Sequence, residues 1–436
     1  MVNEDFGLPS PRTQEPSNDG TEILPSPLNE STLAQHQPPD AFPVFKNGDV
    51  IITTDLGPFP RTFQLHSSVL CRHSPFNGME TYPGESWYHF TIEEIKGKVS
   101  LIRKSADGER PLVSRDSPQI IDGTHIKVED PSDTGTSPVP TPSSPALVAA
   151  TKPPRHSTTI ACYTQIFASF YNIPPKVSTT DISTAVAQSE ALTKLATSLG
   201  SVQPLQAHLA SLFSSYRQTL YLAIAHNPPR WLHLSLALQN RAIYTECLIH
   251  LVGAHPKMPW PKHPTPIPDP IHHLIQQKAL DLANLRGASD RALLLLTLHI
   301  ADPLTQKNRA CDPRNKAEIE SWLAVQVFRD EMAQHISAVG NHPSSSLHLG
   351  RLYRGIARGD WKWMSTEYVR AMLEPTMKLG WKELGEDLRS LRAQAKGVVG
   401  RLARNGLMVE PDGHGVGYLT CVEVGEGDVP WLSGGM

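Results

Sequence analysis

Hydrophobic and polar positions alternate along the first patterned stretch of the chain. The runs "DVIITT" and "TFQLH", at 49–54 and 62–66, are rich in β-branched and aromatic residues, and the breakers of "DLGPFPR" separate them. This pattern predicts two β-strands. A short helix is predicted next in "SVLCRH", because Ser67 or Ser68 can accept hydrogen bonds from the free N–H groups at its start. Further strands are predicted in "WYHFTIEEI" and "KGKVSLIRK", so the stretch predicts a small sheet.

The hydrophobic period changes to that of a helix after about residue 157. In "ACYTQIFASFY" it places Tyr163, Ile166 and Phe167 on one helical face. Segments with this period continue to about Arg404, and a hairpin is predicted after them in "NGLMVEPDGHGVGYLTCVEV". The predicted helices lie at 163–171, 181–199, 203–226, 229–239, 241–254, 270–286, 289–300 and 315–338, with two or three more before Arg404.

Two stretches are polar and rich in proline. Residues 1–43 hold seven acidic residues, one basic residue and eight prolines, and 104–156 has "SPVPTPSSP" at its centre. Segments of this composition bury too little apolar surface to offset the entropy of ordering. We therefore expect a disordered tail at 1–43 and a disordered internal insertion at 104–156.

The order of these elements predicts the fold class. We expect an α+β domain at 44–200, with a small sheet and covering helices, interrupted by the insertion. A mainly α-helical region follows, and the break "GNHPSSS" divides it into a helical domain at 201–340 and C-terminal helices at 345–436 that end in the hairpin.

Composition narrows the class of protein. The chain has 436 residues, a net charge of −3 and five scattered cysteines without a C-x-x-C pair, which favours reduced thiols in the cytosol or nucleus. The N-terminus lacks the pattern of a secretory signal, and the longest apolar run, 292–298, is too short to cross a bilayer. The sequence therefore predicts an intracellular protein without a membrane segment.

One set of residues resembles a known family. Asp49 and Val50 begin the first predicted strand, and His66, Val69-Leu70 and Ser74 follow the pattern H-x-x-V-L-x-x-x-S. This arrangement is similar to the start of a BTB/POZ domain. The chain looks like the fungal BTB proteins that have a long insertion in the domain and a helical continuation. The later segments "RLYRGIARGD" and "YLTCVEV" look like signatures of the same group.

The resemblance implies a non-enzymatic protein–protein interaction protein that serves as a dimerisation or scaffold module. It implies a homodimer seam at the first helix, with Val69 and Leu70 as contributors, and a polar pocket at that seam for Asp49. A strand-edge carboxylate or turn cap is the alternative for Asp49. His66 is counted among the residues of this interface and is expected to be a hydrogen-bonded structural histidine rather than a catalytic one. An alternative function is that of a substrate adaptor for a cullin-type ubiquitin ligase.

The charge distribution leaves a further alternative open, a nuclear regulator that contacts nucleic acid. Residues 351–404 carry a net charge of +6, whereas 405–436 hold five acidic residues and no basic one. A basic helix face can bind phosphates through counterion release. Because no nucleic-acid motif accompanies the charge, pairing with the chain's own acidic tails is favoured. The basic positions at helical spacing are Arg351, Arg354 and Arg358, then Arg389, Arg392 and Lys396.

No pattern in the chain predicts a catalytic set, a cofactor or a metal site. Cys247, His250 and His255 are three candidate ligands, fewer than the four of a structural zinc site. The stretch "GHGVG", at 413–417, lacks the strand, helix and lysine of a phosphate-binding loop, so a tight turn is favoured.

The segment "IKVEDPSD", at 126–133, resembles the acceptor sequence for SUMO conjugation. An unstructured segment can enter the groove of a conjugating enzyme and present the lysine amine. Phosphorylation nearby would add a charge of about −2 at each site. The expected modification sites are Lys127, Ser132, Ser137, Thr141 and Ser144.

Overall fold

The computed structural model describes most of the chain between residues 42 and 432. The described residues are 42–43, 45–56, 60–73, 76, 88–95, 98–104, 110–111, 156–301, 308–340, 345–374 and 381–432. The two segments predicted to be disordered lie almost wholly outside these residues, as do all five expected modification sites.

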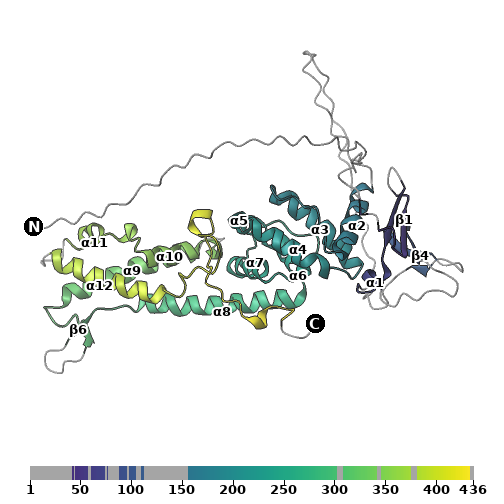
Figure 1. Ribbon diagram of the computed structural model, residues 1–436. Helices are drawn as coiled ribbons and strands as arrows, with labels where there is room; N and C mark the ends of the chain where they lie inside the picture. The colour runs from purple at the N-terminus through teal and green to yellow at the C-terminus, as the bar shows by residue number, and fades with distance from the viewer. Residues whose placement is uncertain are drawn as a thin grey trace, which may run out of the picture. The chain divides into compact units, whose positions relative to one another are not determined.

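A five-stranded sheet forms the first part of the described structure (Figure 1). Its strands follow the order β2-β1-β3-β4-β5, in which β1 and β3 are parallel and the other neighbours are antiparallel. All four strands expected from the alternating pattern are therefore present. The bounds are β1 Val50–Thr54, β2 Arg61–Leu65, β3 Tyr88–Ile95, β4 Lys98–Lys104 and β5 Arg110–Pro111.

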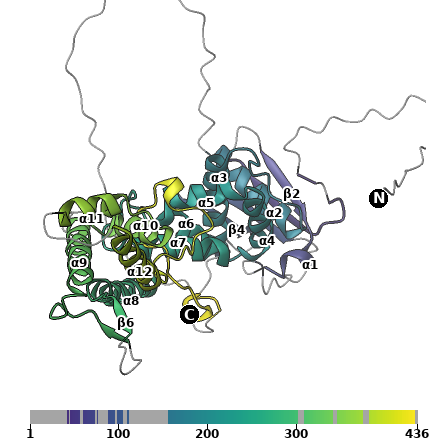
Figure 2. The ribbon, with the colours of Figure 1, turned by 90° about the vertical axis from the view of Figure 1, so that its left-hand side faces the viewer.

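The alternation of side chains buries one face of this sheet. Val50 and Ile52 of β1 have no exposed surface, and Phe63 of β2 is buried beside them. Since successive strand residues point to opposite faces, these side chains project together. Phe63 meets Phe167 of α2 (Ser157–Phe170), with the ring centroids 5.3 Å apart, and Figures 1 and 2 show α2 beside the sheet. The helices after the insertion thus cover the strands before it.

Helices account for most of the described chain after residue 156, so the molecule is α+β with a small sheet and a mainly helical C-terminal region. Their bounds are α1 Ser67–Leu70, α2 Ser157–Phe170, α3 Ile182–Ser198, α4 Gln203–Ser215, α5 Gln218–His226, α6 Pro228–Leu238, α7 Arg241–Ala254, α8 Asp269–Leu294, α9 Ile319–Gly340, α10 Leu349–Arg358, α11 Thr366–Leu373 and α12 Trp381–Val399.

The division of the chain into helices differs from the sequence prediction at two places. The helix expected at 203–226 is divided, because Arg217 adopts a left-handed backbone conformation with φ of 51° between α4 and α5. The two helices expected at 270–286 and 289–300 are replaced by the single helix α8, which continues through Gly287 but ends at Leu294, so the prediction is wrong for 295–300. Glycine lowers helix propensity by only about 1 kcal/mol, and packing of both halves of α8 outweighs this. A short hairpin of β6 (His299–Ala301) and β7 (Asn308–Ala310) then follows.

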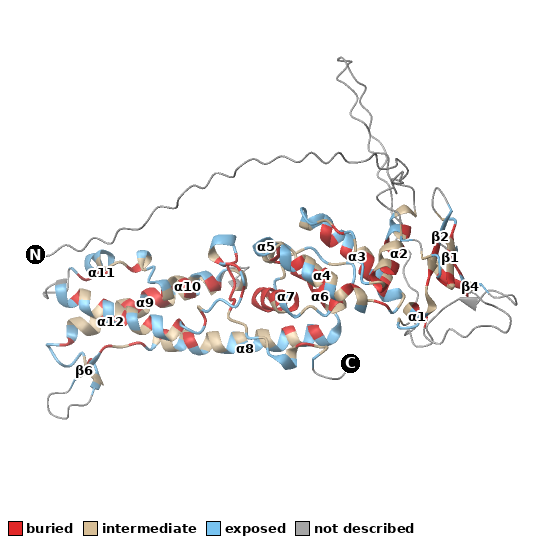
Figure 3. Cartoon of the chain, in the orientation of Figure 1, coloured by how far each residue is buried: buried red, intermediate tan, exposed pale blue. Residues whose placement is uncertain are grey.

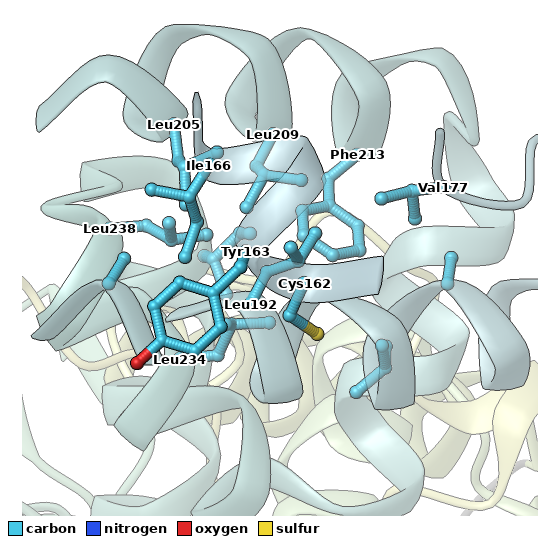
Figure 4. Close-up of a cluster of buried hydrophobic side chains, with 14 of the residues drawn as sticks. Cys162, Tyr163, Ile166, Val177, Leu192, Leu205, Leu209, Phe213, Leu234 and Leu238 are labelled. Carbon is cyan, nitrogen blue, oxygen red and sulfur yellow. The ribbon is translucent and has the colours of Figure 1, made fainter. Parts of the chain in front are cut away.

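Two large hydrophobic clusters organise the described residues. The first runs from Val50 in the sheet through α2 to α7 and reaches Ile275 of α8, and Figure 4 shows its part around Tyr163 and Phe213. The second begins at Leu293 of α8 and includes residues of α9 to α12. The domain boundary predicted at residue 200 falls inside the first cluster, and α8 contributes to both.

The last described segment, residues 405–432, is irregular, and we call it the C-terminal strap. The hairpin predicted there is wrong: within the described strap residues the only regular elements are the 3-10 turns η4 (Asp412–His414) and η5 (Glu426–Asp428). The strap lies against α7 and α10 instead (yellow in Figure 1). A Cβ placed on Gly253 of α7 would lie 2.2 Å from the carbonyl oxygen of Leu419. The strap backbone therefore packs directly against α7 at this glycine.

Candidate functional site

The corner between β2 and α1 holds the residues that carry the family resemblance. Asp49, at the start of β1, accepts hydrogen bonds from the backbone N–H of Ser67 at 2.6 Å and from its hydroxyl at 2.5 Å. Burial opposes ionisation of this carboxyl, but the two bonds from Ser67 outweigh it and hold the pKa of Asp49 below its ordinary value of 3.8. Asp49 thus caps the first turn of α1 from a distant position.

His66 joins three segments at the same corner. Its Nε2 lies 3.1 Å from Oδ1 of Asn47, and its Nδ1 lies 3.3 Å from the hydroxyl of Tyr171. The backbone N–H of His66 also donates to that hydroxyl, at 2.8 Å. These contacts tie the strand–helix junction to the end of α2.

The two hydrophobic residues of α1 lie in different environments. Leu70 has no exposed surface and belongs to the first hydrophobic cluster. Val69 is half-buried against that cluster, whereas Ser68, Cys71 and Arg72 are exposed. Of the two residues expected at a dimer seam, Val69 therefore has surface to offer a partner, and Leu70 serves the core of its own chain.

We expect Asp49→Ala to lower the free energy of unfolding by about 1–2 kcal/mol, because the first turn of α1 loses its cap. The contribution of Asp49 is present above pH 3.8 and is lost as the pH falls through its lowered pKa. Urea denaturation at pH 7 and pH 3 measures both effects. A loss of equal size at the two pH values would contradict the assignment.

A second cluster of polar side chains fixes the strap on α10. Arg354 is 4% exposed, and its Nε and Nη2 donate to Asp412 at 3.1 and 2.8 Å. Its Nη1 donates to the carbonyl of Tyr418 at 2.9 Å, and its Nη2 also donates to the carbonyl of Val416 at 2.7 Å. Arg358 pairs with the other carboxylate oxygen of Asp412. One buried guanidinium therefore satisfies three strap groups.

Several basic residues of α10 and α12 contact groups of the same chain. Arg354 and Arg358, two of the three basic positions on α10, bind the acidic strap, as the favoured interpretation of the charge pattern expects. On α12, Arg392 donates to the carbonyl of Met364 at 2.6 Å and lies over the ring of Trp361. Arg351, Arg389 and Lys396 are exposed. The predicted basic faces are thus partly occupied by groups of the same chain.

The strap also covers two ionisable residues of α7. Glu246 is 2% exposed, and its carboxylate accepts the backbone N–H of Met408 at 3.1 and 3.2 Å. His250 has no exposed surface, and its Nδ1 lies 2.5 Å from the hydroxyl of Tyr418. Burial raises the pKa of Glu246 to about 7, against the bond from Met408, and lowers the pKa of His250 to about 4.

Sequence reasoning missed Glu246 as a residue of interest. Figure 3 shows α7 as almost entirely buried, and eleven of its residues, Glu246 and His250 included, have little exposed surface. A helix with apolar residues on every face is buried all round, so any polar residue within it is also buried. The hydrophobic residues on every face of "YTECLIHLVGA", at 244–254, are the sequence signal that would have indicated a buried Glu246.

A pocket of about 300 Å³ lies beside the strap. Tyr418 and His414 of the strap line it, together with Trp260 and with His226 from the end of α5. Trp260 and Tyr418 are nearly perpendicular, with ring centroids 6.1 Å apart, and the Trp260 Nε1–H donates to the carbonyl of Ala225 at 3.0 Å. The pocket therefore has an aromatic wall with two imidazoles.

Cys247, His250 and His255, the three ligand candidates, all lie within the described residues. In the part of the chain that the structure describes, no group of three or more His, Cys, Asp or Glu side chains is arranged to hold a metal ion. None of the described helices carries an apolar stretch long enough to span a membrane. Comparisons with protein-family models, with curated proteins and with solved structures found no match to this chain.

Proposed function

We propose that the chain is a non-enzymatic protein–protein interaction protein, whose BTB/POZ-like module at 44–200 mediates association. The observation that carries the proposal is the edge of the sheet. Among the described strands β2 pairs only with β1, and Arg61 and Thr62 of β2 are exposed. An edge strand offers unpaired backbone groups to a second chain, which is a common basis of protein association.

The neighbouring helix supports the same surface. The helix α1 follows β2 directly, so the half-buried Val69 and the exposed Arg72 lie next to this edge in the chain. The core continues from the sheet into α2 to α8, so the module and the helical region share one hydrophobic cluster. Two associated copies then present two helical regions, and a partner bound at both gains from the effective concentration.

We expect the wild-type chain to be a dimer at tens of micromolar and Val69→Asp to be monomeric, because a partner would bury the new charge. Static light scattering measures the mass, and circular dichroism checks the fold. Ser68→Asp is the matched control, since it adds the same charge at an exposed neighbouring position. A monomeric wild type would remove the premise. Co-purification of a cullin with the wild-type chain would favour the adaptor alternative.

A further inference from the structure

Glu246 and His250 lie one turn apart on α7 beneath the strap, and the structure gives neither an oppositely charged partner. Within the described contacts the Glu246 carboxylate accepts only the N–H of Met408. The Nδ1 of His250 meets the neutral hydroxyl of Tyr418, and its buried Nε2 has no hydrogen-bond partner. Two ionisable groups are therefore enclosed together without a salt bridge.

The groups that surround the pair do not supply the missing charge. On α7 the nearest titratable neighbour is Cys247, which is also buried. From the strap comes Tyr418, whose pKa burial raises, so its hydroxyl stays protonated. From α10 comes Arg354, which is already paired with Asp412. The ring of Trp260 also lies beside the pair, nearly perpendicular to that of His250, with the centroids 6.4 Å apart.

The charge state of the pair depends on whether the strap covers it. In water a glutamate ionises near pH 4.5 and a histidine near 6.5, so between these values an open pair is Glu246⁻ and His250⁺. Burial penalises both charged forms, because among the described contacts the Glu246 carboxylate and the His250 ring form no ion pair with each other. The covered pair is most stable as a neutral carboxylic acid and a neutral imidazole.

We propose that the strap closes on Glu246 and His250 as a neutral pair, so that closure transfers one proton from the imidazolium to the carboxylate. The two side chains together hold one proton before and after closure, and none is exchanged with solvent overall. This device goes beyond the association function and does not depend on it. It keeps the free energy of strap closure independent of pH between 4.5 and 6.5.

The direction of each pKa shift determines how that side chain changes the free energy of strap closure with pH. The pKa of His250 falls on burial, so His250 favours the closed strap above pH 6.5 and opposes it as the pH falls towards 4. The pKa of Glu246 rises, so Glu246 favours the closed strap below pH 4.5 and opposes it as the pH rises towards 7. Between 4.5 and 6.5 the two slopes have opposite signs and cancel.

Hydrogen exchange of the full chain, read as protection factors of strap residues 405–420, tests the proposal. We expect a flat wild-type profile between pH 4.5 and 6.5. In Glu246→Gln, protection should fall about tenfold for each pH unit as the pH decreases in this window. In His250→Gln, protection should fall by about the same factor for each unit as the pH increases.

A control variant and an infrared measurement complete the experiment. Glu383→Gln, an exposed position on α12, is the matched control and should keep the flat profile. The infrared band of a protonated carboxylic acid at pH 6 should be present in wild type and weaker in Glu246→Gln, which needs no stability measurement. Flat profiles in both single variants, a sloped wild type, or an unchanged infrared band would overturn the proposal. None of these results depends on whether the chain dimerises.

Discussion

Replacing Gly350 by alanine is expected to lower the free energy of unfolding by about 3 kcal/mol, the upper range for overpacking a tight contact. Gly350 lies in the first turn of α10, where a Cβ would come within 2.0 Å of the carbonyl oxygen of Tyr418 and 2.6 Å of Nη1 of Arg354. The nearest atom is backbone and cannot rotate away, so the strap must move. Urea denaturation of both proteins measures the loss.

Gly355 provides the matched control on the same helix. No atom lies within 4 Å of a Cβ placed there, so Gly355→Ala adds a methyl group in open space. Because alanine loses less conformational entropy in a helix, this variant should gain about 0.5–1 kcal/mol. Equal losses in the two variants would show that the α10–strap contact is not the cause.

Arg354→Ala is expected to cost roughly 3–5 kcal/mol, the loss seen when one partner of a buried ion pair is removed. Asp412 loses one of its two guanidinium partners and keeps Arg358, and the carbonyls of Val416 and Tyr418 lose their Arg354 donors. Since a buried pair is screened little by salt, the loss should persist at high ionic strength. Chemical denaturation at two salt concentrations measures it.

Arg351 is the control for charge and helix position. It is exposed on the same helix, and its link to the strap is a backbone one, from its N–H to the carbonyl of Gly417 at 3.1 Å. Arg351→Ala should therefore change stability by no more than about 0.5 kcal/mol. If Arg351→Ala cost as much as Arg354→Ala, net charge and not the buried contacts would explain the loss.

The sequence predicted the elements that depend on local pattern. Alternation located β1 to β4, and the helical period located α3, α6 and α7 to within a few residues of their ends, because each reflects neighbours in the chain; α2 begins six residues before the predicted helix at 163–171. The interruption at Arg217 depends on one residue in a left-handed conformation, which no apolar pattern reports. The continuity of α8 depends on packing at its two ends.

The strap shows why the rest could not be predicted. Its alternating apolar residues suggested a hairpin, but the residues that hold it lie far away in sequence, on α7 and α10. Asp49 is a similar case, since it caps a helix that starts at Ser67. Such contacts depend on the tertiary arrangement. The expected modification of Lys127 lies outside the described residues and stays a prediction.

The order of the strap and the helices along the chain affects how a cell makes this protein. The ribosome produces α7 and α10 before the strap, so the close-packed surfaces around Gly253 and Gly350 are exposed on the nascent chain until the strap has emerged from the ribosome. Exposed apolar surface of this kind is what chaperones bind. A premature stop codon just after α12 leaves all the α-helices of the described chain encoded but removes the strap, which packs against α7 and α10. The product is then a substrate for proteolytic quality control.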